Sequence, residues 1–212
     1  METLNTILNN KIIAIARGLY GDSLISASKA LYDGGIRVFE VTFEQNKPFV
    51  QTNEAVEQLY NNLPNDVVVG VGTVLSAEQL ISAARSNAAF AISPNTNCGI
   101  IAQTKALGMV SIPGALTPTE IITAYDSGAD IVKVFPAGMM GVEYFKAIVA
   151  PLKYIPMAAV AGINLNNIKR FADAGAVAFG ISSGLYNKEH IANCNYSRIT
   201  QLAREYCTAL NE

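Results

Sequence analysis

The segment DSGADIVK, residues 126–133, carries the pattern that decides the fold of this 212-residue chain. A helix-like stretch leads into it, a glycine follows, and an apolar strand-like run begins a few residues later. The pattern recurs as DGGIRVFE (33–40), ALGMVSIP (106–113) and DAGAVAFG (173–180). Helices and strands therefore alternate, as in a parallel sheet with helices on its faces. The glycines expected to end these helices in the left-handed conformation are Gly34, Gly108, Gly128 and Gly175.

Eight short runs rich in valine and isoleucine are predicted to be strands, and the longer amphipathic stretches between them to be helices. The strand runs show little polar alternation, which indicates burial on both faces. Ser76 before Glu78, and Thr117 before Pro118 and Glu120, have the residue types of helix N-terminal caps. The predicted strands are residues 11–17, 37–43, 67–70, 90–93, 109–113, 131–135, 157–160 and 177–181. The predicted helices are residues 23–33, 48–61, 76–86, 117–127, 142–149 and 164–174.

Eight strand–helix units leave about 26 residues for each unit, which fits a (β/α)8 barrel at the small end of its size range. An open, doubly wound sheet uses the same repeat. However, the chain has no G-x-G-x-x-G after its first strand, where a dinucleotide-binding sheet would carry it. No linker or shift in composition divides the chain. We therefore expect one α/β domain over residues 1–212, a (β/α)8 TIM barrel.

The composition excludes several classes of protein. Half of the residues are apolar, 15% are charged and the net charge is −2, whereas an average soluble domain has roughly 25% charged residues. Intrinsic disorder and a basic nucleic-acid-binding surface are both excluded by these values. No apolar run approaches the roughly 18 residues of a membrane helix, and no secretory signal pattern is visible. We expect a cytoplasmic protein that binds neither nucleic acid nor membrane.

The cysteines and the single histidine argue against metal and disulfide chemistry. Cys98, Cys194 and Cys207 are odd in number and form no CxxC motif. This pattern favours free thiols in a reducing cytosol over a disulfide scaffold or a zinc site. With His190 as the only histidine, a His-rich metal cluster and a Ser-His-Asp triad are both disfavoured.

Lys133 lies inside a predicted strand with apolar residues on either side. The two-residue period of a strand places it on one face with Ile131 and Phe135. A buried lysine is unfavourable unless it is paired or its pKa falls. The neutral amine that results from a lowered pKa can attack a ketone and form a Schiff base. The structural alternatives are a buried ion pair and a side chain that reaches the rim of the barrel.

Glu40 has a similar position in the second predicted strand, where it shares a face with Val38 and Thr42. A carboxylate inside the barrel could pair with Lys133, either structurally or as a general acid and base. Function in such barrels lies at the carboxyl ends of the strands. The two buried charges are therefore the candidate catalytic residues.

Further candidate residues stand at the ends of other strands. Arg17 could hold a carboxylate through two hydrogen bonds, or could simply be solvated. The segment Phe179–Gly184 supplies small residues with free N–H groups at a helix start, which would bind an anion, or would form a plain tight turn. Gly162 would contribute to this anion site from the neighbouring loop. The stretch Gly70–Thr73 lacks the remainder of a P-loop, so it has no nucleotide role.

The chain resembles the class I 2-dehydro-3-deoxyphosphogluconate (KDPG) and 4-hydroxy-2-oxoglutarate (KHG) aldolases, which are lyases of (β/α)8 fold. The resemblance runs from about Leu8 to Leu210. It implies a Schiff-base aldolase that cleaves a 2-keto-3-deoxy-4-hydroxy acid to pyruvate and an aldehyde, with no metal or organic cofactor, as a homotrimer. The strings that carry it, in this order, are GGIRVFEVTF, VGVGTVLSAEQL, FAISPNTN, IPGALTPTE, VKVFPA and YSRITQLAREY.

Matched residue by residue, the resemblance implies that Lys133 forms the Schiff base and that Glu40 is the general acid and base. Thr73 corresponds to a residue that binds the carboxylate of the substrate. Phe135 corresponds to a residue packed beside the imine. The residues that correspond to the region holding the distal phosphate are Gly162, Gly180 and Ser182.

Two departures from the family pattern leave the substrate open. Glu44 stands where the family commonly has an arginine, so Arg17 is expected to share or take over binding of the carboxylate. The family's T-G-G-I turn is VAGI at residues 160–163, which lacks a hydroxyl and a glycine. The favoured substrate is KDPG, with 4-hydroxy-2-oxoglutarate or an unphosphorylated 2-keto-3-deoxy acid as alternatives. A phosphosugar epimerase or isomerase, or a non-catalytic sugar-acid-binding barrel, are the competing functions.

Overall fold

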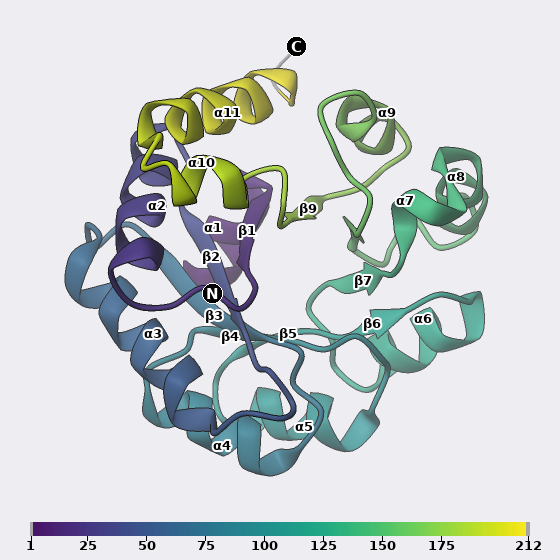
Figure 1. The fold of residues 1–212 in the computed structure, drawn as a ribbon. Coiled ribbons are helices and arrows are strands. Elements are labelled where there is room, and N and C mark those ends of the chain that lie inside the picture. The colour runs from purple at the N-terminus through teal and green to yellow at the C-terminus, as the bar shows by residue number, and fades with distance from the viewer. Residues whose placement is uncertain (1, 211–212) are drawn as a thin grey trace.

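The computed structural model describes residues 2–210 and shows an α/β barrel (Figure 1). Within this range, nine parallel strands form one sheet in the order β5-β4-β3-β2-β1-β9-β8-β7-β6. The two end strands, β5 and β6, follow each other in the chain with only Pro113 between them. The ring therefore closes through one broken strand, which pairs with β4 and with β7. The predicted (β/α)8 barrel is confirmed. The strands are β1 Ile12–Ala16, β2 Val38–Thr42, β3 Val68–Gly72, β4 Phe90–Ile92, β5 Val110–Ile112, β6 Gly114–Ala115, β7 Val132–Val134, β8 Met157–Val160 and β9 Ala178–Ile181.

Most helices surround the ring of strands (Figure 1). The first helix instead packs against β2, β3 and β9, and buries Ile7 in the core inside the barrel. None of the helices in residues 2–210 is long and apolar enough to cross a membrane. The helices are α1 Glu2–Asn10, α2 Gly21–Asp33, α3 Phe49–Asn62, α4 Ala77–Arg85, α5 Cys98–Ala106, α6 Pro118–Asp126, α7 Ala137–Met140, α8 Val142–Val149, α9 Ile168–Asp173, α10 Lys188–Ala192 and α11 Tyr196–Ala209.

No helix range was predicted for α1, α5, α7, α10 or α11, although the expected glycine at position 108 marks the end of α5. Helix α10 buries no residue, so it has no apolar face to detect. Helix α7 is a single turn of four residues, which is too short for a periodic signal. The six helices that were predicted are present, with ends that differ by a few residues.

The strands sort their side chains onto two faces with a period of two. Inward residues such as Ile13, Val38 and Ile131 form the core inside the barrel. The residues between them, such as Val41 and Val132, pack beneath the surrounding helices. The face predicted to carry Ile131, Lys133 and Phe135 is the inner face of the barrel, because the inner core includes Ile131 and is contacted by Phe135.

The helix ends follow the expected chemistry with two corrections. The cap of α6 is confirmed, because Thr117 and Glu120 form a reciprocal capping box. At α4, the partner of Ser76 is Gln79 and not Glu78, since only the third helical residue can reach back to the cap.

The second correction concerns the glycine that ends α2. Gly34 is right-handed, with φ of −86°, and Gly35 takes the left-handed conformation, with φ of +108°. Gly34 is required for space, because a side chain there would collide with Ala203 and the Thr200 carbonyl of α11. The expected left-handed glycines Gly108, Gly128 and Gly175 are confirmed.

Candidate active site

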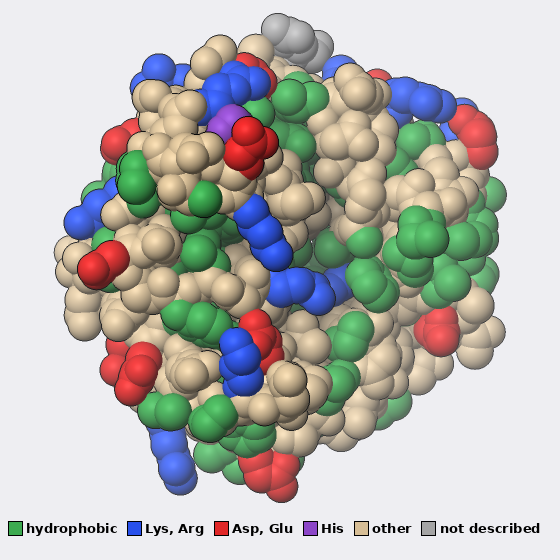
Figure 2. Space-filling model, in the orientation of Figure 1, with side chains coloured by type: hydrophobic (Ala, Val, Ile, Leu, Met, Phe, Trp, Pro, Cys, Tyr) green, Lys and Arg blue, Asp and Glu red, His purple; other side chains and the backbone are tan. Residues whose placement is uncertain are grey.

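The carboxyl ends of β1, β2, β7, β8 and β9 surround a pocket of about 390 Å³. Figure 2 shows a hollow near the middle of this face, with Lys or Arg side chains beside it. Seven of the eight predicted site residues line this pocket: Arg17, Glu40, Lys133, Phe135, Gly162, Gly180 and Ser182. The barrel therefore brings together residues that are more than 160 positions apart in the chain.

Lys133 is held in the middle of β7, and only 6% of its surface is exposed. Its Nζ atom lies 4.6 Å from the centroid of the Phe135 ring. Burial lowers the pKa of Lys133, and the nearby Glu40 carboxylate opposes this shift, while Arg17 adds to it. The amine is consequently easier to deprotonate than an ordinary lysine, as a nucleophile requires.

Glu40 is the buried acid of the site, with 2% of its surface exposed. Burial raises the pKa of its carboxyl group, and the positive charges of Lys133 and Arg17 oppose this shift. Its Oε2 atom is buried and has no hydrogen-bond partner within residues 2–210. No ion pair within 4.0 Å joins Glu40 to Lys133 in the described part of the chain. One structural alternative for Lys133, a closed ion pair with Glu40, is therefore not seen in the structure.

Two inward-facing glycines of β3 make room for this arrangement. A side chain at Gly72 would collide with the carboxyl group of Glu40, and one at Gly70 would collide with the ring of Phe90. The glycine-rich stretch at residues 70–73 belongs to β3 and its end. It gives the buried carboxylate its space.

Thr73 differs from the other predicted residues, because it does not line this pocket. It follows β3 directly, is partly buried, and has a left-handed backbone with φ of +59°. Its carbonyl oxygen accepts a hydrogen bond of 2.9 Å from Nε2 of Gln45. The end of β3 thus lies against the loop that follows β2.

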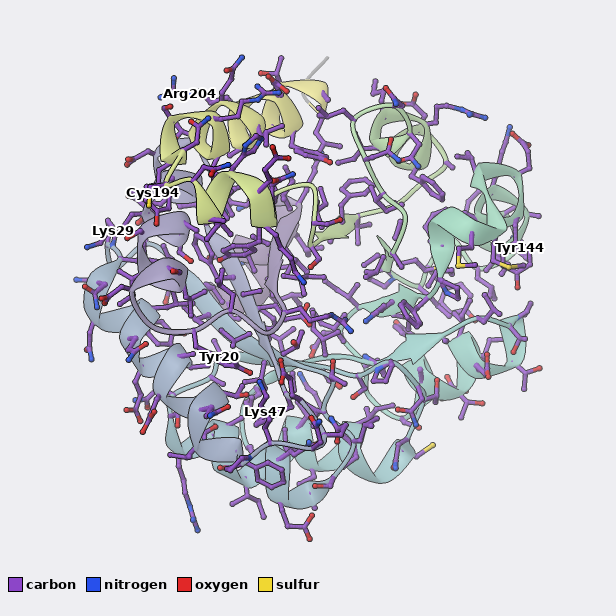
Figure 3. All side chains as sticks on the ribbon, in the orientation of Figure 1. Tyr20, Lys29, Lys47, Tyr144, Cys194 and Arg204 are labelled. Atoms are coloured by element: carbon purple, nitrogen blue, oxygen red, sulfur yellow. The ribbon has the colours of Figure 1, made fainter. Side chains whose placement is uncertain are left out.

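The side chain of Glu44 pairs with Lys47, three residues further along the chain. Glu44 forms an ion pair of 2.6 Å with Lys47, and a side chain at Gly18 would come within 2.7 Å of its Oε1 atom. Lys47 also lies 5.7 Å from the ring of Tyr20, and both residues are labelled in Figure 3. Glu44 does not line the pocket, whereas Arg17 does.

The far end of the pocket is formed by the loops that follow β8 and β9. Ala161 and Gly162 are both left-handed, with φ of +72° and +75°. The N–H of Gly138 in α7 donates to the carbonyl of Ala161 at 2.8 Å, which ties this loop to the neighbouring one. After β9, the N–H groups of Leu185 and Tyr186 donate to the carbonyl of Ser182, so residues 182–186 form one turn.

Sequence reasoning missed several residues of this far end, including Asn164 and Tyr206. Tyr206 comes from α11, in the last part of the chain, and is 3% exposed. A signal was available, because Ile199, Ala203 and Tyr206 have the spacing of a buried helix face. That spacing predicts burial, but it does not indicate which strand ends lie above the helix.

Other features of the described chain add no further chemistry to the site. The three cysteines are free, and none of them lines the pocket. Within residues 2–210, no three His, Cys, Asp or Glu side chains are grouped so that they could hold a metal ion.

These features define a class of protein, an α/β-barrel enzyme with a buried lysine and a buried acid at the catalytic end of the barrel. Residues 4–202 match the family described as KDPG and KHG aldolases. The chain belongs to this family, and it is therefore an aldehyde-lyase of the pyruvate aldolase type.

Individual relatives agree with this membership. The chain is 31% identical to the 2-dehydro-3-deoxy-6-phosphogalactonate aldolase of Escherichia coli, over 95% of each protein. It is 32% identical to a 2-dehydro-3-deoxy-phosphogluconate aldolase of Haemophilus influenzae, over 92% of this chain and 90% of the relative. A KDPG aldolase of Legionella pneumophila, solved with pyruvate as a covalent carbinolamine, has a TM-score of 0.85 and 26% identity over 96% of this chain and 97% of that one.

Proposed function

We propose that this protein is a class I aldolase that cleaves a 2-keto-3-deoxy-4-hydroxy-6-phospho acid to pyruvate and glyceraldehyde 3-phosphate. The observation that carries the proposal is the pair of buried charges, Lys133 and Glu40, which face one pocket without forming a closed ion pair. The carbinolamine captured in the Legionella relative supports an amine nucleophile in this family.

The first step requires a neutral amine on Lys133. Its Nζ atom attacks the C2 ketone, and the carbinolamine then loses water to give an iminium ion. Glu40 supplies the proton for the departing hydroxyl, which suits a carboxyl group whose pKa is raised by burial. Phe135, whose ring lies 4.6 Å from Nζ, covers one side of the reacting nitrogen.

The second step breaks the C3–C4 bond. The Glu40 carboxylate, now without its proton, takes the proton of the C4 hydroxyl, directly or through a water molecule. The electron pair of the C3–C4 bond moves to the iminium nitrogen, and C4 leaves as the carbon of an aldehyde. The remaining enamine takes the proton back at C3, and hydrolysis of the imine releases pyruvate and free Lys133.

We propose that the two ends of the substrate are held by different groups. Arg17 carries the charge that attracts the carboxylate, since Glu44 at the family's arginine position is paired with Lys47. The distal phosphate lies against Gly162, Gly180 and Ser182, where backbone N–H groups and a hydroxyl are available. The resemblance assigns Thr73, at the end of β3, to the same carboxylate, although its side chain does not line the pocket.

The relatives leave the configuration at C4 open. The gluconate and galactonate substrates named for the relatives are epimers at C4, which becomes the aldehyde carbon on cleavage. Both epimers therefore give the same products, and product analysis alone does not distinguish them. Initial rates on the two separate epimers, with 4-hydroxy-2-oxoglutarate and an unphosphorylated 2-keto-3-deoxy acid beside them, measure the preference as ratios of kcat/KM.

Borohydride trapping tests the chemistry directly. Reduction in the presence of pyruvate should leave one stable adduct on Lys133, seen by peptide mass spectrometry, and Lys133→Met should abolish it. Lys29→Met is the matched control, because Lys29 is exposed on the outer side of α2 (Figure 3). No adduct on Lys133, with full turnover, would refute the Schiff-base mechanism and favour the epimerase or isomerase. Tight binding of a 2-keto acid without turnover would favour the non-catalytic barrel.

We further propose that the enzyme is a homotrimer in the cytoplasm, as the resemblance implies. Exposed apolar side chains on α6, on α7 and in the segment before β8 support self-association; they are Met139, Met140, Tyr125 and Tyr154. Met139 is 83% exposed and Tyr154 is 61% exposed, which is unusual for large apolar side chains. Figure 2 shows hydrophobic side chains gathered on the side of α6–α8. Three free cysteines agree with a reducing compartment.

A further inference from the structure

A second cavity, of about 490 Å³, lies beside the active-site pocket. Its walls come from the end of β1, the turn after β9, and α10, and we call it the side pocket. It shares Arg17, Ser182 and Ser183 with the active-site pocket. The volume lies in the range of small-molecule sites, which are concave and mostly apolar with a few polar groups.

The inner wall of the side pocket is apolar. Leu19, Ile191, Ala192 and the ring of Tyr186 form it. The hydroxyl of Tyr186 is not available to a ligand, because it is hydrogen-bonded at 2.7 Å to the buried Ser28 hydroxyl. The pocket therefore meets a ligand with the aromatic face or edge of Tyr186, and favours a hydrocarbon group.

The polar part of the side pocket is cationic. Arg17 and Lys188 line it, and neither forms an ion pair with another described residue. No Asp or Glu lines it, and the chain as a whole has a net charge of −2. Two cations at a cavity whose lining residues include no acid favour an anion. Among the described residues that line this cavity there is no Asp, Glu, Cys or His that could act as an acid, a base or a thiol nucleophile. We therefore infer a binding site and not a second catalytic site.

We propose that the side pocket binds an organic anion with a compact hydrocarbon body, of the class of aryl or branched alkyl carboxylates, sulfonates and phosphates. The hydrocarbon lies against Leu19, Tyr186 and Ile191, and the anionic group lies between Arg17 and Lys188. Because one guanidinium serves both cavities, an occupant of the side pocket competes with the substrate carboxylate for Arg17. The competition rests on the proposed function, whereas binding to the side pocket does not.

Calorimetry with naphthalene-1-sulfonate tests the binding. We expect one molecule to bind per chain, and Lys188→Gln to weaken it about tenfold, the effect of losing about 1.4 kcal/mol from a charge-assisted contact. Ala192→Phe, which fills the cavity, should also weaken binding. Lys29→Gln is the matched control and should leave the dissociation constant unchanged, as it removes a lysine from the outer surface. Far-UV circular dichroism confirms that each variant is folded.

Two comparison ligands separate the parts of the proposal. Neutral 1-naphthol and inorganic sulfate should each bind at least tenfold more weakly than naphthalene-1-sulfonate. Equal binding of either one, or binding that is insensitive to both Lys188→Gln and Ala192→Phe, would overturn the proposal.

Kinetics test the competition for Arg17. Naphthalene-1-sulfonate should raise KM for the cleaved substrate and leave kcat unchanged, and Lys188→Gln should shift this inhibition to higher concentrations without altering basal turnover. Binding at the side pocket with no effect on KM would overturn the shared-arginine step. Loss of the borohydride adduct would overturn the Schiff-base mechanism and leave the binding result standing, so the two failures are distinguishable.

Discussion

Replacing Gly72 by alanine is expected to disable the enzyme by displacing Glu40. Gly72 faces into the barrel from β3, and its neighbour across the sheet, Thr42, lies two residues beyond Glu40. An added Cβ atom would lie 2.5 Å from Cδ and 2.9 Å from Cγ of Glu40, and would overlap its Oε1 atom. The carboxyl group is the only part of this contact that can move, since the other side is strand backbone.

The magnitude follows from the overlap. Carbon atoms in contact prefer about 3.5–4.0 Å, so the carboxyl group of Glu40 must move by about 1 Å. A displacement of about 1 Å at a catalytic group can reduce the rate about 100-fold, and loss of general acid–base catalysis costs about 10² to 10⁴. Overpacking of this kind typically costs about 1–3 kcal/mol of stability. We therefore expect Gly72→Ala to lower kcat at least 100-fold, with a folded but less stable protein.

A double-mutant cycle shows whether Glu40 is the cause. The free energy of unfolding is measured by urea denaturation for the parent, Gly72→Ala, Glu40→Ala and the double variant, and pyruvate release is measured in a coupled assay. In the Glu40→Ala background the alanine at 72 has space, so its cost should nearly vanish, which gives a coupling energy of about 1–3 kcal/mol. An unchanged cost in that background, or a kcat of Gly72→Ala within about threefold of the parent, would refute the reasoning.

Four other perturbations have definite expected results. Glu40→Gln should exceed the parent in stability at pH 7 and match it below pH 4.5, because a carboxyl group with a raised pKa stabilises the fold at low pH and loses this as pH rises through the folded pKa. Lys133→Met should be more stable than the parent at neutral pH, and the difference in stability should vanish toward pH 10.5. The reason is that a lowered pKa of Lys133 makes the parent lose stability as the pH falls below 10.5. Urea denaturation at a series of pH values measures both variants, and a stability difference that does not change with pH would contradict the prediction. Ala161→Gly should raise the free energy of unfolding by about 1 kcal/mol, since φ of +72° is unfavourable for alanine; an unchanged melting temperature would count against it. Met139→Glu should convert the proposed trimer to monomers in sedimentation velocity, and a parent that is already monomeric at micromolar concentration would remove the trimer proposal.

The fold was predictable because its signal is local and repeated. Each apolar strand run indicates burial on both faces, and each glycine that precedes such a run by a few residues marks the end of a helix. The break of the fifth strand at Pro113 was not predictable, because it depends on pairing with β4 on one side and β7 on the other. That Gly35 and not Gly34 is left-handed has a similar cause. The space at Gly34 is limited by α11, which lies about 170 residues further along the chain.

The candidate site was predictable in part because buried charges are rare in apolar strands. Lys133 and Glu40 stand out in the sequence for that reason, and the strand period places each on one face with the residues two positions before and after it. The sequence could not show that Glu44 pairs with Lys47. It also could not show that Tyr206 packs against the loop after β9. Both depend on which side chains neighbouring loops place beside them.

The sequence by itself therefore determined the repeated strand–helix architecture and the two charges that chemistry would use. Local propensity and periodicity are properties of short segments, and they need no partner to be visible. Only the tertiary structure decided that Gly72 makes room for Glu40, that no closed ion pair joins Glu40 to Lys133, and that Arg17 lies between two cavities. These are distances between atoms far apart in the chain, and they exist only once the ring of strands has closed.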